Sequence, residues 1–216
     1  ITYDKKYGEK DIHYTIYVVV DDDDKIYSNE SEKNKIISFT NLVKNVSIQF
    51  ISSNGIAKGW VTKMWNKAFK KAYDDGCDYF YQCGDDIEFL DKEWTIYCIK
   101  AMEMHNNTGI TGPIDWGREQ FKMANNGQGK FILTQTFVSR KHMDNFGFYF
   151  PEEIKNWFCD DWITYVYISK NKYWPIQKRI LNKGGDPRYE PDGKGKDFQR
   201  MTEKCIILIN KYNKLI

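Results

Sequence analysis

An aromatic, strand-like run near the middle of the chain ends in two adjacent carboxylates. The run is Tyr79-Phe80-Tyr81-Gln82-Cys83, and Gly84, Asp85 and Asp86 follow it. In an open α/β sheet, ligands bind at the carboxyl ends of the strands. Carboxylates at such a place can hold a divalent cation, which neutralises the charge of a diphosphate. Because hard oxygen ligands suit Mg²⁺ or Mn²⁺, we predict that Asp86 binds one of these cations with Asp85 beside it.

Two further acidic groups stand at comparable places in the sequence. Asp21 to Asp24 follow the apolar run Val18-Val19-Val20, and Asp160-Asp161 stand before Trp162. Any one cluster has a plain structural explanation, since Asp is common in turns and also complements the dipole at a helix N-terminus. Together they predict one acidic pocket. In it, one carboxylate of the Asp160-Asp161 pair would deprotonate an acceptor hydroxyl while the other orients it.

Basic and aromatic residues near these clusters are weaker candidates. Four basic side chains could contact a phosphate group as a loop closes. Each of them taken singly is better explained as a solvated surface residue. These basic residues are Lys58, Lys63, Lys183 and Arg188. Four aromatic residues flank the expected pocket and could stack on a sugar ring, although core packing is the ordinary role of such rings. They are Trp116, Tyr149, Trp157 and Trp162.

Composition limits the class of protein. With 216 residues the chain fits one large domain, and a net charge of +2 gives no broad basic surface for nucleic acid. The five cysteines show no CxxC spacing, so free thiols in a reducing compartment are expected. We find no signal peptide and no apolar run near the ~20 residues of a membrane span. A soluble, cytoplasmic protein is therefore expected.

The order of elements predicts an α/β fold. Strands are expected at 14–20, 46–52, 79–83 and 134–139, and helices at 32–44, 60–73, 92–105 and 197–215, with a Gly- and Pro-rich loop over 182–196. Alternating strands and helices favour a doubly wound sheet, and the shorter strands after Gly109 favour a mixed second half. We predict one domain over 1–216, with a nucleotide-binding half at 1–110 and an acceptor-side half at 111–216 that includes the C-terminal loop and helix.

With these motifs the chain resembles the nucleotide-sugar-dependent glycosyltransferases of the GT-A fold, over residues 14 to 180. The resemblance implies a Rossmann-like domain with a mixed central sheet flanked by helices. It also implies that Asp21, Asp22 and Asp23 contact the nucleotide, as do Lys63 and Asn66 on the helix at 60–73. Gly84-Asp85-Asp86-Ile87 matches the family's Asp-x-Asp motif, with Asp86 at the metal-binding position and Gly84 in place of the first acid.

The resemblance further implies an activity. Asp161 matches the general base of inverting members and Asp160 its acidic neighbour. The expected reaction moves a sugar from a nucleotide diphosphate sugar, a UDP-sugar in particular, to the hydroxyl of a glycan or other acceptor with Mn²⁺ or Mg²⁺. Arg188, in the glycine-rich loop, is expected to contact the donor phosphates.

Two features of the sequence depart from this pattern or extend it. The family's first strand has no counterpart in residues 1–10, so we expect a fragment of a longer protein or an unusual variant. The sequence is also similar in style to glycosyltransferases of large DNA viruses, which would place it in the host cytoplasm.

Two other functional classes fit parts of the sequence. A metal-dependent nucleotidyltransferase shares the architecture, but it would be expected to carry a Gly-rich phosphate loop near its first strand. A non-catalytic carbohydrate- or Ca²⁺-binding module would use the acidic loops as calcium sites, but Asp21 to Asp24 lack the alternating ligands and central glycine of an EF-hand loop.

Overall fold

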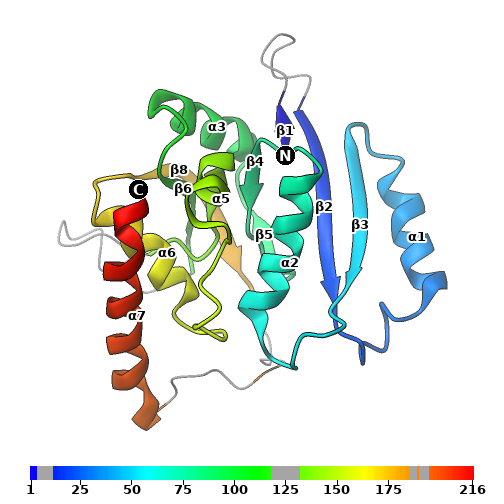
Figure 1. The fold of residues 1–216 in the computed structure, drawn as a ribbon. Helices are drawn as coiled ribbons and strands as arrows, with labels where there is room; N and C mark the ends of the chain where they lie inside the picture. Colours follow the sequence, from blue (N-terminus) through cyan, green and yellow to red (C-terminus); the bar gives the residue numbers. More distant parts are fainter. Residues whose placement is uncertain (4–11, 118–131, 185–188, 190–194) are drawn as a thin grey trace.

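The computed structural model describes residues 1–3, 12–117, 132–184, 189 and 195–216 (Figure 1). Strand β2 (Ile12–Val20) pairs in parallel with β3 (Val46–Ser52), in register from Tyr14 opposite Val46 to Val20 opposite Ser52. Helix α1 (Glu30–Thr40) connects them and lies outside β3. The short strand β1 (Thr2–Tyr3) pairs antiparallel with β2 and completes a three-stranded sheet.

A second sheet holds the remaining described strands. These are β4 (Tyr79–Tyr81), β5 (Ile87–Phe89), β6 (Ile110–Asp115), β7 (Phe137–Ser139) and β8 (Tyr173–Asn182). Their order is β4-β7-β6-β8-β5, with β6 and β8 parallel and the other neighbours antiparallel. This arrangement confirms the predicted α/β fold with a mixed sheet, and strands from both halves of the sequence pair within it.

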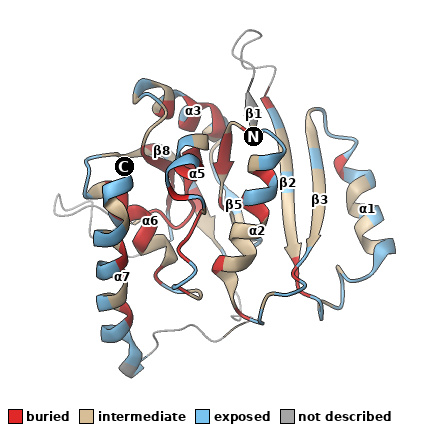
Figure 2. Cartoon of the chain, viewed as in Figure 1, coloured by how far each residue is buried: buried red, intermediate tan, exposed pale blue. Residues whose placement is uncertain are grey.

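Helices cover these sheets. They are α2 (Val61–Asp74), α3 (Trp94–Met104), α5 (Arg140–Phe146), α6 (Cys159–Ile168) and α7 (Phe198–Tyr212), with short 3₁₀ turns at Gly195–Asp197 and Asn213–Leu215. Helix α2 buries Ala68, Phe69 and Ala72, as the predicted amphipathic pattern requires. In Figure 2, α6 is mostly buried, whereas α1 and α7 expose much of their surface. In the part of the chain that the structure describes, no helix has both the length and the apolar composition needed to span a bilayer.

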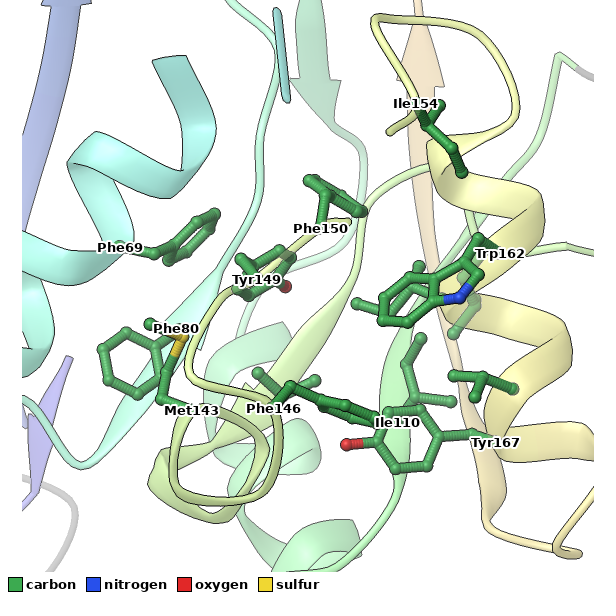
Figure 3. Packing of buried hydrophobic residues seen from close by; sticks show 14 of the residues in the cluster. Phe69, Phe80, Ile110, Met143, Phe146, Tyr149, Phe150, Ile154, Trp162 and Tyr167 are labelled. Atoms are coloured by element: carbon green, nitrogen blue, oxygen red, sulfur yellow. The ribbon is translucent and has the colours of Figure 1, made fainter. Parts of the chain in front are cut away.

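The main core lies among α2, α6 and the loop that follows α5 (Figure 3). Tyr149 stacks on Phe69 with ring centroids 3.6 Å apart, and both Tyr149 and Trp162 are fully buried. The hypothesis that Tyr149 and Trp162 stack on a sugar is therefore wrong, because other core rings cover them. Trp116 and Trp157 are about half exposed, so stacking by these two stays a prediction.

Strand β6 was not predicted, because Gly112 and Pro113 read as chain breakers. The structure accommodates both. A Cβ atom at position 112 would lie 2.5 Å from the backbone oxygen of Gln135, so the close approach of that segment requires glycine. Pro113 falls at the irregularity in the β6–β8 register, between Gly112 and Ile114, where a strand tolerates a missing N–H donor.

Candidate functional site

The Asp85-Asp86 turn follows the carboxyl end of β4 and is held from two sides. The backbone nitrogen of Gly84 donates to Oε1 of Gln135 at 3.0 Å, and the backbone oxygen of Asp86 accepts from the nitrogen of Lys183 at 2.9 Å. A Cβ atom on Gly84 would lie 2.5 Å from Oδ1 of Asp86. A side chain at position 84 would therefore require the Asp86 carboxylate to move.

Cys83 stands directly before this turn. Burial raises the pKa of the Cys83 thiol to about 12, and the charges of Asp86 and Asp85 add to the shift. The residue therefore stays a neutral thiol at physiological pH. Thiolate chemistry is thereby disfavoured at this position.

The Asp21–Asp24 cluster forms the loop after β2. Asp22 Oδ1 accepts from Ser52 Oγ at 3.0 Å at the end of the neighbouring strand, and the Lys58 ammonium pairs with the Asp23 carboxylate. Asp24 Oδ1 accepts from the nitrogens of Ile26 and Tyr27 at 2.9 and 2.7 Å. Asp24 is thus a turn-forming residue, whereas Asp21 to Asp23 lie at the edge where parallel strands β2 and β3 both end.

Helix α2 carries the two further residues expected at the nucleotide. Lys63 Nζ lies 3.4 Å from Glu152 Oε2 and 4.5 Å from the centre of the Trp60 ring. Asn66 Nδ2 donates to the backbone oxygen of Phe150 at 2.8 Å. Its Oδ1 accepts from the nitrogens of Tyr149 and Phe150 at 3.0 and 2.9 Å. Asn66 therefore fastens α2 to the loop that leads to α6, and its contact with a nucleotide stays a prediction.

Asp160 and Asp161 occupy the first turn of α6. The residue before this helix, Phe158, has a left-handed backbone with φ of 73°. A bulky residue in this region costs about 1–3 kcal/mol and is more frequent at functional sites than elsewhere. Both carboxylates complement the helix dipole, which is the structural role that the sequence analysis offered for this pair. That role is compatible with catalysis.

Tyr149, in the loop between α5 and α6, is tied to the segment at the end of β4. The hydroxyl of Tyr149 donates to the backbone oxygen of Thr136 at 2.9 Å, and Gln82 of the β4 end donates its backbone nitrogen to the same oxygen at 2.9 Å. Burial raises the pKa of Tyr149, and its hydrogen bonds with the Thr136 side chain and the Gln82 backbone offset part of that shift. Tyr149 thus shares its hydrogen-bond acceptor with the segment that leads to Asp85. That Asp160 and Asp161 share a pocket with Asp85 and Asp86 stays a prediction.

A polar cluster that the sequence did not single out lies beside the turn. Asp115, at the end of β6, is 7% exposed, and its carboxylate accepts from Gly117 N at 3.2 Å, Thr134 Oγ1 at 3.4 Å and Asn182 N at 3.4 Å. Because Lys183, next to Asn182, contacts Asp86, the end of β8 is held between Asp115 and the acidic turn. The sequence signal for Asp115 would have been an acidic residue at the carboxyl end of a strand. That signal could not be used, because β6 itself had not been predicted.

Two basic candidates remain, Lys183 and Arg188, and Arg179 is a further basic residue that the sequence analysis did not single out. Lys183 Nζ pairs with Glu88 Oε2 at 2.8 Å. Arg179 forms a bidentate pair with Asp91, through its Nη2 and Nε atoms at 2.9 Å each, and its guanidinium lies 5.4 Å from the ring centre of Trp116. Arg188 lies outside the described residues.

The donor set near Asp86 fits a hard cation. Among the described residues, no group of three or more His, Cys, Asp or Glu side chains is arranged as a metal site. Mg²⁺ is ordinarily held in proteins by one or two carboxylates, with water and substrate phosphate oxygens completing its coordination. Asp85 and Asp86 offer carboxylates of this chemical type, and cation binding by Asp86 stays a prediction.

Comparison with known proteins identifies the fold. No protein-family model and no curated protein matches the sequence. The structure is similar to that of TarS from S. aureus, a glycosyltransferase, with a TM-score of 0.56 and 12% identity. The match covers 91% of this chain and 39% of the TarS chain, so this chain spans about two fifths of that protein. At this identity the likeness shows the fold alone, a mixed α/β, Rossmann-like arrangement that this chain shares with part of TarS.

Proposed function

We propose that the protein is a metal-dependent glycosyltransferase that uses a nucleotide diphosphate sugar, in particular a UDP-sugar. The observation that carries the proposal is the pairing of a glycosyltransferase fold with carboxylates after the ends of β2 and β4 and at the start of α6. Ligands of open α/β sheets bind at such strand ends. The donor would lie across the Asp21–Asp23 loop and the Asp85-Asp86 turn, and the acceptor near Asp160 and Asp161.

The reaction assigns a separate role to each cluster. Asp161 takes the proton of the acceptor hydroxyl while the hydroxyl oxygen attacks the anomeric carbon of the donor sugar. The configuration at that carbon therefore inverts. The bond from that carbon to the phosphate oxygen breaks, and the nucleoside diphosphate leaves. Asp160 orients Asp161. A cation held by Asp86 would neutralise the diphosphate charge, and Lys63 and Arg188 would add positive charge around the phosphates.

A donor-hydrolysis assay tests this proposal without a known acceptor. The protein is incubated with a panel of sugar nucleotides in Mn²⁺, in Mg²⁺ and in EDTA, and nucleoside diphosphate and pyrophosphate are both measured. Nucleoside diphosphate released from one donor in Mn²⁺ or Mg²⁺, but not in EDTA, is the expected result. Pyrophosphate release would indicate a nucleotidyltransferase instead. Reversible sugar or Ca²⁺ binding, with no turnover of any donor, would favour the binding-module class.

A further inference from the structure

The side chain of Gln82 is buried at the end of β4 without a hydrogen bond. The residue is 8% exposed, and its Oε1 atom has no hydrogen-bond partner in the part of the chain that the structure describes. Its backbone nitrogen, in contrast, donates to the backbone oxygen of Thr136 at 2.9 Å. The pairing of β4 with the segment before β7 thus continues through Gln82. A buried acceptor without a donor destabilises a fold, so this amide requires an explanation.

Other amide side chains near Gln82 are fully engaged in the structure. Gln135 accepts a hydrogen bond from the Gly84 nitrogen at 3.0 Å. Asn66 makes three hydrogen bonds to the backbone of residues 149 and 150. The amides of Gln135 and Asn66 therefore have a structural role that the amide of Gln82 does not share.

Two aromatic residues also bury a polar atom that has no partner among the described residues. They are Tyr81, through its hydroxyl, and Trp162, through Nε1. An aromatic ring stabilises the core by the large apolar area that it buries, which offsets one unpaired polar atom. Gln82 has no ring to provide such contact. Packing therefore explains the burial of Tyr81 and Trp162, but not that of Gln82.

The side chain of Gln82 lies on the sheet face of the main core. Because side chains alternate along a strand, Gln82 shares its face with Phe80, which belongs to the main core together with residues of α6. Thr136, opposite Gln82, agrees with this direction, since its hydroxyl lies 2.8 Å from that of Tyr149 in the same core. Tyr81 points to the other face, where it packs against a second core cluster beside α3.

This position is close in sequence to the proposed donor site. Cys83 alone separates Gln82 from the Gly84–Asp86 turn. In the proposed reaction the diphosphate lies at Asp86 and the anomeric carbon faces Asp161 of α6, so the donor sugar would lie on the α6 side of the end of β4. Nε2 of Gln82 also has no hydrogen bond to a described residue, but unlike Oε1 it is not fully enclosed. The amide group is therefore within reach of a ligand.

We propose that Gln82 is a specificity-determining residue that binds a hydroxyl group of the donor sugar. A sugar hydroxyl both donates and accepts, so it can bond with Oε1 or with Nε2 of the amide. A buried amide discriminates against a ligand that lacks the hydroxyl, because the amide is then left unpaired. This inference rests on the proposed function, since it takes the same donor and the same site.

Gln82→Met tests the inference, because methionine keeps the unbranched shape of the side chain and removes the amide. Tyr81→Phe is the matched control, since it removes the neighbouring buried polar atom on the opposite face of β4. A hydrolysis assay first selects the donor that the wild type uses from UDP-glucose, UDP-galactose and UDP-N-acetylglucosamine. Titration calorimetry in Mn²⁺ then gives the affinities for that UDP-sugar and for UDP. Thermal unfolding gives the Tm of each protein without ligand.

Gln82→Met should bind the UDP-sugar about 3- to 10-fold more weakly than the wild type and bind UDP equally well. Its Tm should be equal or higher, because an unpaired buried acceptor is removed. Tyr81→Phe should bind both ligands as the wild type does. These results together would separate a contact with the sugar from a general effect on the fold.

Equal affinity of Gln82→Met and the wild type for the UDP-sugar would overturn the inference and leave the proposed function intact. Equal weakening of UDP-sugar and UDP binding would overturn it too, because the amide would then support the turn or the cation and not the sugar. A lower Tm of Gln82→Met would show that the amide is bonded within the protein, with the same consequence. A wild type that binds and hydrolyses none of the three UDP-sugars would contradict the proposed function itself, and this inference with it.

Discussion

Gln135 Oε1 lies 3.0 Å from the backbone nitrogen of Gly84 and accepts its hydrogen bond. This contact joins the segment before β7 to the turn that carries Asp85 and Asp86. Gln135 is only 5% exposed, so water does not readily replace the amide if it is lost. The position of the two carboxylates thus depends on a residue about fifty positions away in the sequence.

Replacing Gln135 with leucine should weaken metal-dependent donor binding by about 10-fold, because the Gly84 N–H is left without its acceptor and the turn can shift. The same change should lower the free energy of unfolding by about 1–3 kcal/mol. Gln135→Glu retains an acceptor oxygen and serves as the matched control. Titration calorimetry with the donor and Mn²⁺ gives the affinity. Equal affinity in the leucine variant and the wild type would show that this contact does not position the site.

Asp86→Ala should reduce donor affinity in Mn²⁺ by at least about 10- to 100-fold while leaving the Tm of the protein without ligand nearly unchanged. The reason is that Asp86 is proposed to bind the cation and that its backbone, which bonds to Lys183, is kept. Glu88→Ala, two residues further on, is the control, because Glu88 pairs with Lys183 on an exposed surface. If the Asp86 variant bound donor as well in Mn²⁺ as the wild type, the metal role would have to move to another residue.

Asn66→Ala should destabilise the protein by about 2–4 kcal/mol, since three hydrogen bonds to the 149–150 backbone are removed at once. Urea unfolding measures this change. Asn66→Asp keeps the acceptor that serves Tyr149 and Phe150 but not the donor to the Phe150 oxygen, and it should lose less stability. A loss of donor affinity in Asn66→Asp, with folding intact, would support the additional contact with the nucleotide.

His142 makes stability depend on pH. Its ring is 1% exposed, with Nε2 3.0 Å from the carbonyl oxygen of Tyr149 and Nδ1 2.9 Å from the hydroxyl of Tyr167. The carbonyl can only accept, so Nε2 carries the proton of the neutral ring. Burial lowers the pKa of His142 from 6.5 to about 4.

Because the unfolded state binds a proton near pH 6.5 and the folded state does not, this contribution is complete above pH 6.5. It is lost as the pH falls from 6.5 toward 4, to a total on the order of 3 kcal/mol. Urea unfolding at several pH values should show this slope in the wild type, and His142→Gln should flatten it. Replacing the exposed His13 with glutamine should leave the slope intact. An equal slope in wild type and His142→Gln would assign the pH dependence to other groups.

Local patterns predicted the first half of the fold well. The strand expected at 46–52 is observed at Val46–Ser52, and the helix expected at 60–73 at Val61–Asp74, because both have clear period-2 or period-3.6 patterns. Strand β8 (Tyr173–Asn182) was missed, since its pairing with β6 and β5 is long-range and Pro175 lies within it. Tertiary contacts, not local preference, select that segment as a strand.

The candidate site was predictable only where acids follow recognisable elements. Asp21, Asp86 and Asp161 could be singled out from the sequence for that reason. Gln135 and Asp115 could not, because their importance comes from contacts with Gly84 and Asn182 that no sequence spacing reveals. The burial of Tyr149 likewise follows from packing against Phe69 and not from any local signal.

The central claim is tested most directly by replacing Asp161 with asparagine, a change of one carboxylate oxygen for an amide group at the start of α6. With a donor that the wild type hydrolyses in Mn²⁺, nucleoside diphosphate release is measured beside donor affinity and Tm, and Asp160→Asn is the matched control. The account predicts that Asp161→Asn lowers release by about 10²- to 10⁴-fold with affinity and Tm unchanged, and that Asp160→Asn loses less. Release by Asp161→Asn at the wild-type rate would contradict the assignment of Asp161 as the base. Absence of metal-dependent release from any sugar nucleotide by the wild type would contradict the proposed function itself.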